Sequence, residues 1–130
     1  MKNPLALWAC FLAVLMAGQA ARSETVKSVY DGDTITLQNG EHIRLACIDA
    51  PELKDNAHGK ADKPAAIASR NYLRNLLSGR EVTLQRVTQD RYGRTVARVF
   101  TGSLDVSQEM VAAGYATIYT RYSQPCPWAQ

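Results

Sequence analysis

The first third of the chain alternates apolar and polar positions in a way that predicts three β-strands. Residues 26–30, 34–37 and 42–48 are rich in β-branched side chains, which suit the pleated backbone of a strand. Turn signals at Asp31-Gly32 and Asn39-Gly40 separate the three segments. The pattern therefore predicts a meander of three consecutive strands.

The second turn allows two registers. A two-residue Asn-Gly turn would place Ile35 opposite Arg44 and mix apolar and charged groups on one face. A three-residue turn ending at a left-handed Gly40 pairs Ile35 with Ile43 instead. We favour the second register, because it keeps the apolar side chains on one face.

This register also predicts which side chains lie at the rim of the core. Alternation carries Asp33 and Asp49 onto the inward face, at the open end of the hairpin, and sends Arg44 to the opposite face. Strand twist or a bulge would have to bring Arg44 back to the rim. The apolar side chains predicted on the inward face are Ile35, Leu37, Ile43, Leu45 and Cys47.

Helical periodicity appears twice in the rest of the chain. The polar residues 53–62 predict a loop, and a helix beginning with a proline follows over 64–77. A second, short helix covers 105–114, with Asp105 as its N-cap. The side chains predicted on the buried stripe of the longer helix are Ala65, Ala68, Tyr72 and Leu76.

Two more alternating segments, 81–87 and 95–100, give the order βββ–α–ββ–α. A parallel sheet would need helices between most of its strands, whereas this order suits a small closed barrel. We therefore predict a mainly β (α+β) fold, a five-stranded OB-fold barrel with a helix after strand 3 and a short C-terminal helix.

Residues 1–20 predict a secretory signal peptide rather than part of the fold. Lys2 precedes an apolar run that is short for a membrane span, and small residues at 18 and 20 mark a cleavage site after Ala20. An uncleaved anchor is the alternative. Cleavage would remove one charge, Lys2, and lower the net charge from +3 to +2, so fourteen basic residues would face twelve acidic ones. We expect a secreted or periplasmic protein.

The rest of the chain has the size of one domain, which we place at 24–122 with a short irregular tail at 123–130. Beyond the signal, two cysteines remain, Cys47 and Cys126. In an oxidising compartment they could form a disulfide. Alternatively, Cys47 is a buried small hydrophobe and Cys126 a free thiol, because sequence alone does not fix their Cα separation. We expect a monomer.

Acidic residues gather at the open end of the first hairpin. Asp33 and Asp49 could bind a hard divalent cation, which prefers oxygen ligands. Calcium suits such an irregular site, whereas zinc would require histidine or cysteine, and neither histidine stands at ligand spacing. The alternative is an ordinary turn, since Asp and Gly favour turns without any function.

Three further charged residues suit phosphate chemistry. Glu52 follows a proline that restricts its direction, and its carboxylate could orient or deprotonate a water beside a metal ion. Arg44 and Arg94 could grip a phosphate and offset the charge of a five-coordinate transition state. Taken singly, a loop glutamate and a strand arginine are ordinary surface residues.

Three motifs, "DGDT", "RLACIDAPE" and "DRYGR", resemble in this order and spacing the staphylococcal nuclease (thermonuclease) family of calcium-dependent secreted nucleases. The resemblance covers about 24–122 and implies an OB-fold barrel that hydrolyses phosphodiester bonds of DNA and RNA with low sequence specificity. It implies calcium ligands at Asp33, Asp49 and the backbone carbonyl of Ala50, where the best-known member has Thr.

The resemblance also assigns roles to the remaining residues. It places the catalytic glutamate at Glu52 and the two phosphate-gripping arginines at Arg44 and Arg94. Tyr92 and Tyr122 then lie near the nucleotide, where base stacking would tolerate any sequence.

Two other functional classes stay open. Family members usually continue into a C-terminal helix, whereas this chain ends in "SQPCPWAQ", where two prolines forbid a regular helix, so an inactive remnant is one alternative. The other is a non-catalytic OB-fold module that binds single strands through tyrosines and basic residues. Such a module has no need of Asp33, Asp49 and Glu52, whose negative charge opposes nucleic acid.

Overall fold

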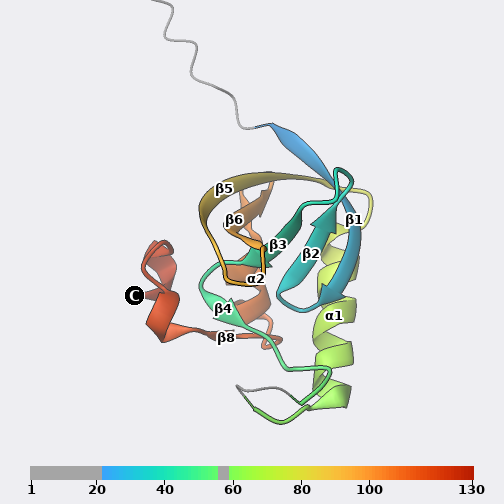
Figure 1. Ribbon diagram of the computed structural model, residues 1–130, viewed down its shortest axis with the longest axis vertical. Helices are drawn as coiled ribbons and strands as arrows, with labels where there is room; N and C mark the ends of the chain where they lie inside the picture. Colours follow the sequence, from blue (N-terminus) through green and yellow to red (C-terminus); the bar gives the residue numbers. More distant parts are fainter. Residues whose placement is uncertain (1–21, 56–58) are drawn as a thin grey trace, which may run out of the picture.

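The computed structural model describes residues 22–55 and 59–130 (Figure 1). The predicted signal peptide, 1–20, lies outside the described residues, as do 56–58 of the predicted loop. Within the described ranges, no helix has both the length and the apolar character needed to cross a membrane.

Three antiparallel strands begin the fold, as the sequence predicts. Ile35 lies opposite Ile43, and Gly40 has a φ of +88°, so the register with the three-residue turn is confirmed. The apolar side chains of the second and third strands, Ile35, Leu37, Ile43 and Leu45, are fully buried. The bounds are β1 (Ser23–Asp31), β2 (Thr34–Leu37) and β3 (His42–Leu45).

One parallel strand pair brings the two ends of the sheet together. β1 pairs with β2 and β5, β5 pairs with β6, and β6 returns to β3 in parallel, with Arg44 beside Val96. Each of the five longer strands therefore has at least two strand neighbours, as in the partly open barrel of the OB type. The predicted fold class is confirmed. The additional bounds are β5 (Glu81–Gln89), β6 (Thr95–Thr101) and β7 (Leu104–Asp105).

The prediction of one continuous strand over 42–48 is wrong. Cys47 has a φ of +75°, in the left-handed region that residues with a side chain seldom occupy, and the turn there interrupts the strand. The prediction that Asp49 lies on the inward face is also wrong, because the turn shifts the alternation: Ile48 is buried, whereas the side chain of Asp49 is 48% exposed. After the break, β4 (Ile48–Asp49) pairs with β8 (Thr117–Ile118).

The long helix α1 (Lys63–Leu77) packs against β1, and its predicted buried stripe is wrong. Ala68 is exposed, while Tyr72 and Leu76 are only partly buried. The helix carries small or apolar residues on two adjacent stripes, and its contacts with the barrel decide which one faces inward. The buried side chains are Ala66, Ser69, Leu73 and Leu77.

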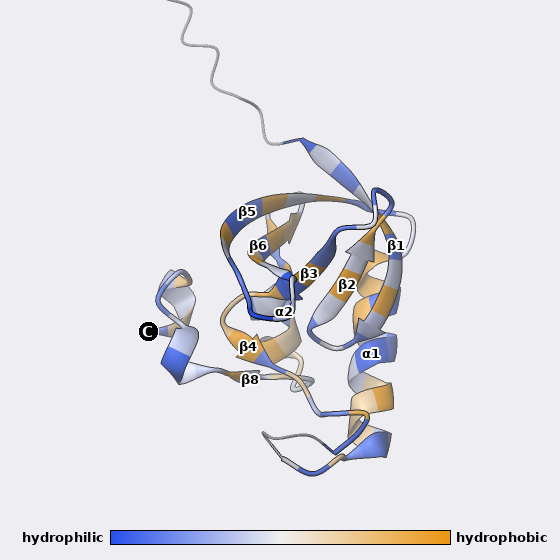
Figure 2. Cartoon of the chain, viewed as in Figure 1, coloured by the Kyte–Doolittle hydropathy of each residue, from blue (hydrophilic) through white to orange (hydrophobic). Residues whose placement is uncertain are grey.

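The second helix, α2 (Val106–Ala112), begins at the predicted cap, where the side chain of Asp105 accepts a hydrogen bond from the backbone N–H of Gln108 at 3.1 Å. Together the barrel and the helices enclose one main apolar core, and in Figure 2 the hydrophobic positions alternate with polar ones along the strands. The largest fully buried core side chains are Ile35, Leu37, Ile43, Leu45, Ile48, Leu73 and Met110.

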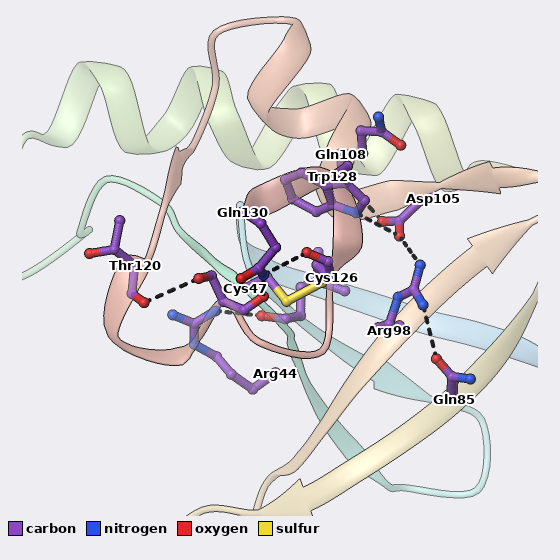
Figure 3. The surroundings of a disulfide bond; sticks show 12 residues. Arg44, Cys47, Gln85, Arg98, Asp105, Gln108, Thr120, Cys126, Trp128 and Gln130 are labelled. Carbon is purple, nitrogen blue, oxygen red and sulfur yellow. Dashed lines mark hydrogen bonds and ion pairs between the residues drawn. A yellow bond between two sulfur atoms is a disulfide. The ribbon is translucent and has the colours of Figure 1, made fainter.

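The C-terminal residues pack against the barrel although no α-helix follows Tyr122 in the described part of the chain. Cys47 and Cys126 form a disulfide, with their Cα atoms 6.4 Å apart (Figure 3). The indole N–H of Trp128 donates a hydrogen bond to Asp105 at 3.0 Å. Two short 3-10 turns complete the chain, η1 (Thr120–Tyr122) and η2 (Pro127–Ala129).

Candidate functional site

The turn between β1 and β2 holds two buried carboxylates. Asp33 is 4% exposed, and its side chain accepts hydrogen bonds from the backbone N–H of Ala50 at 2.9 Å and from the hydroxyl of Thr34 at 2.9 Å. Asp31 accepts the backbone N–H of Asp33 at 3.0 Å. The turn is therefore fixed by hydrogen bonds that also bring Ala50, just after β4, to Asp33.

Gly32 is required between these two carboxylates because the turn lies directly against α1. A Cβ atom at this position would stand 1.8 Å from the Oγ of Ser69 and 2.9 Å from the Cβ of Ala50. Ser69 in turn donates its hydroxyl to the carbonyl of Tyr115 at 2.8 Å, so it has little freedom to move. Because glycine has no side chain, α1 can pack directly against the turn that carries Asp31 and Asp33.

Asp31 is a charged residue to which the sequence pattern gave no role. Burial raises the pKa of Asp31 to about 7, and the negative charge of Asp33 adds to the rise, while Arg44 opposes it. Burial therefore disfavours the ionised form of this carboxylate, and a positive charge nearby favours it.

Arg44 supplies that positive charge. Its Nη2 lies 3.4 Å from Oδ2 of Asp33 and 3.5 Å from Oδ1 of Asp49, and its Nη1 donates to the carbonyl of Leu45 at 2.8 Å. The expectation that alternation would carry the side chain of Arg44 away from these carboxylates is wrong. The break in the strand after Leu45 puts Asp49 within reach, so the two predicted metal ligands and the first predicted arginine meet at one point.

The second predicted arginine joins this group through Thr34. Arg94 Nη1 lies 3.4 Å from the Thr34 hydroxyl, which itself donates to Asp33. On its other side, Arg94 Nε donates to Oδ2 of Asp90 at 2.7 Å. Burial acts to raise the pKa of Asp90, but hydrogen bonds from the backbone and side chain of Arg94 outweigh it and lower this pKa. Asp90 therefore stays charged and orients the guanidinium.

A groove of about 1460 Å³ runs over this cluster. Its volume exceeds the roughly 300 to 1,000 Å³ typical of small-molecule pockets, so it can accept a segment of a polymer. Glu52, which is partly exposed, lines the groove together with the predicted metal ligands Asp33 and Asp49 and both arginines, and the predicted stacking residues Tyr92 and Tyr122 are 65% and 57% exposed. The groove also contains Arg91 and Arg121, which the sequence did not single out.

Residues 42–128 match the family of staphylococcal nuclease homologues. This range includes the barrel from β3 onward, the arginines and the disulfide-bonded tail. The chain belongs to this family.

Three relatives of the chain carry the name endonuclease. The chain is 36% identical over 124 residues to an uncharacterized endonuclease of Escherichia coli O157:H7, which covers 92% of the chain and 74% of the relative. It is 45% identical over 82 residues to the probable endonuclease LCL3 of Candida tropicalis, covering 59% of the chain and 34% of the relative. The match to an uncharacterized endonuclease of Haemophilus influenzae is 39% over 102 residues, 53% of that protein. The chain thus spans between a third and three quarters of these relatives.

The oxygen atoms at the rim fit the calcium ion that the resemblance to staphylococcal nuclease implies. Asp33 and Asp49 each have a carboxylate oxygen within 3.5 Å of the same cationic nitrogen of Arg44, so the two carboxylates lie near one positive charge. Among the described residues, no three His, Cys, Asp or Glu side chains come together as a metal cluster. A cation here would therefore depend on two carboxylates, backbone oxygen and water, which suits a hard ion with adaptable coordination.

Proposed function

We propose that this chain is a calcium-dependent nuclease that hydrolyses phosphodiester bonds of DNA and RNA with low sequence specificity. The observation that carries the proposal is the meeting of Arg44 with Asp33 and Asp49, connected through Thr34 to Arg94. Two guanidinium groups and a cation site in one groove match the charge of a phosphodiester and the additional charge of its transition state.

Each predicted site residue then has a role in the reaction. Asp33 and Asp49 would hold the cation, which supplies Lewis-acid stabilisation of a phosphate oxygen when it is bound. Arg44 and Arg94 would donate hydrogen bonds to the phosphate oxygens, more strongly as negative charge grows in the transition state. In this scheme both arginines act through hydrogen bonds and charge, not through proton transfer.

Glu52 would act on the attacking water. Among the described residues its side chain has no hydrogen-bond or ion-pair partner, and it lines the same groove as Asp49. A carboxylate in this place can accept a proton from water as the new phosphorus–oxygen bond forms, while the bond to the leaving oxygen breaks and that oxygen takes a proton from solvent water. General-base assistance of this kind contributes about 10² to 10⁴ in rate.

The exposed tyrosines support low sequence specificity. Tyr92 and Tyr122 line the groove and are largely exposed, and stacking of a base on an aromatic ring does not depend on which base it is. The Cys47–Cys126 disulfide supports a secreted or periplasmic location, because disulfides persist in oxidising compartments.

The test measures cleavage of heat-denatured DNA and of RNA by the wild-type protein, in calcium and in excess chelator. Calcium-dependent loss of both substrates is expected. Glu52→Gln should retain affinity for nucleic acid while its turnover falls about 10²-fold or more. Glu24→Gln, on β1 outside the groove, is the matched control and should cleave like the wild type.

Two results would contradict the proposal. Cleavage that is equal with and without chelator would remove the cation from the scheme. A folded wild-type protein that binds single strands without cutting them would favour a non-catalytic OB-fold binding module instead.

A further inference from the structure

One residue anchors both ends of a loop beside the site. The backbone carbonyl of Cys47 accepts a hydrogen bond from the N–H of Tyr119 at 2.8 Å, and its sulfur is bonded to Cys126. Cys47, with its positive φ, also lies in the turn between Arg44 and Asp49. We call residues 119–126 the anchored loop. Its two ends are fixed to the turn that assembles the candidate cation site.

The anchored loop forms part of the groove wall. Tyr119, Arg121, Tyr122 and Gln124 line the same groove as Arg44 and Arg94. The loop is internally ordered, since the rings of Tyr119 and Tyr122 meet edge to face with their centroids 5.2 Å apart. The guanidinium carbon of Arg121 lies 5.5 Å from the centroid of the Tyr122 ring, so the cation and the ring form one exposed unit.

Arg121, like Arg91 in the same groove, has no acidic partner among the described residues. Arg86, Arg94 and Arg98 each form an ion pair with a carboxylate, whereas Arg121 forms none with any described residue. It is also exposed in a groove that holds three other arginines, Arg44, Arg91 and Arg94. A guanidinium without a carboxylate partner at the wall of this groove is available for a phosphate of a bound strand.

We propose that Arg121 binds a phosphate of the substrate strand away from the bond that is cut, and that the Cys47–Cys126 disulfide positions it by fixing the anchored loop. The inference rests on the proposed nuclease function and adds to it a second contact point for a polynucleotide. It predicts that substrates long enough to reach the anchored loop bind more tightly than shorter ones.

The test compares Arg121→Gln with Arg74→Gln, an exposed arginine in the last turn of α1 that does not line the groove. Binding of a labelled 12-nucleotide single strand is measured in chelator over a series of salt concentrations. Loss of one phosphate contact should lower the slope of log K against log salt by about 0.7, with affinity falling about three- to tenfold at low salt. Arg74→Gln should keep the wild-type slope.

Kinetics in calcium give a second readout that a merely structural role would not produce. For the 12-nucleotide substrate, Arg121→Gln should raise KM rather than lower kcat, and the change in KM should be smaller for a dinucleotide. An unchanged salt slope in Arg121→Gln would overturn the inference, and so would failure of the wild type to bind at the lowest salt. If the wild type binds but does not cut, the nuclease proposal fails while the slope comparison still decides the role of Arg121.

The disulfide part of the proposal is tested by reduction. A reduced wild-type protein that stays folded by circular dichroism should lose the same affinity as Arg121→Gln, and reducing the variant should add no further loss. Additive losses would show that the disulfide does not act through Arg121. If reduction unfolds the protein, the double variant Cys47→Ala/Cys126→Ala combined with Arg121→Gln, measured at low temperature, makes the same comparison.

Discussion

Removing the Cys47–Cys126 disulfide should strongly destabilise this protein. The two cysteines lie 79 residues apart in the chain, so the bond closes a long loop in the unfolded state. In the chain-entropy model, a loop of this length corresponds to about 4.5 kcal/mol of stability at 25 °C. Both cysteines are buried, so substitution adds a packing loss that reduction of the wild type largely avoids.

The corresponding change in melting temperature follows from the size of the domain. About 110 residues unfold with an entropy of about 0.23 kcal/mol/K, so 4.5 kcal/mol corresponds to a Tm lower by roughly 15 to 20 °C. Thermal unfolding would be followed by circular dichroism for the wild type with and without reductant. The variant Cys47→Ala/Cys126→Ala is the control, and reductant should leave its Tm unchanged.

A fall in Tm of less than about 4 °C on complete reduction would refute this reasoning, because it corresponds to roughly 1 kcal/mol. The unfolded chain would then already be restricted without the bond, or the backbone contacts of the tail would hold it alone. Either result would also weaken the positioning role given to the disulfide.

Three further predictions test other parts of the site. Gly32→Ala should destabilise the fold by about 1 to 3 kcal/mol in urea unfolding and reduce calcium-dependent cleavage, because its Cβ would meet α1; Gly59→Ala, which meets nothing, should be neutral, and equal effects would contradict the packing argument. A hydrogen bond from Arg86 lowers the pKa of Glu41 in the folded protein, so this carboxylate stabilises the fold above its unfolded-state pKa and loses the contribution as pH falls through the lowered value. Glu41→Gln should therefore flatten the dependence of urea stability on pH between about 5 and 3, and an unchanged curve would exclude that pair. Asp90→Asn keeps an oxygen acceptor for the turn but loses the charge that orients the guanidinium of Arg94. We therefore expect kcat/KM to fall about tenfold, with no change in Tm beyond a few degrees. Wild-type kinetics in this variant would argue against orientation by Asp90.

The hairpin and its register could be predicted from the sequence because both depend on local patterns. Alternation decides the face of Ile35 and Ile43, and the position of Gly40 decides the turn. The short helix was likewise predictable at its start, where Asp105 is a conventional N-cap. These parts of the fold depend only on residues close together in the sequence, so the sequence pattern was enough to predict them.

The assembly of the site could not be predicted in the same way. Alternation assumes an uninterrupted strand, and nothing in "RLACIDAPE" indicates that Cys47 takes a left-handed backbone conformation. That single turn brings Arg44 and Asp49 together. The inward face of α1 was missed because the close approach of Ser69 to Gly32 is a tertiary contact without a periodic signal. Arg121 belongs to no sequence motif, and its place in the groove becomes visible only in the folded structure.

The parallel pairing of β3 with β6 has a consequence for how activity arises during folding. The pair joins Arg44 to Val96 across more than fifty residues, and such distant contacts form late because closing a long loop costs entropy. The hairpin with its carboxylates can form early, but Arg94 reaches it only with β6, and the anchored loop comes later still in the chain. A growing chain therefore carries the carboxylates and Arg44 long before Arg94 and Arg121 arrive. We expect the protein to be harmless to nucleic acids in the cell that makes it until almost the whole chain has been synthesised and folded.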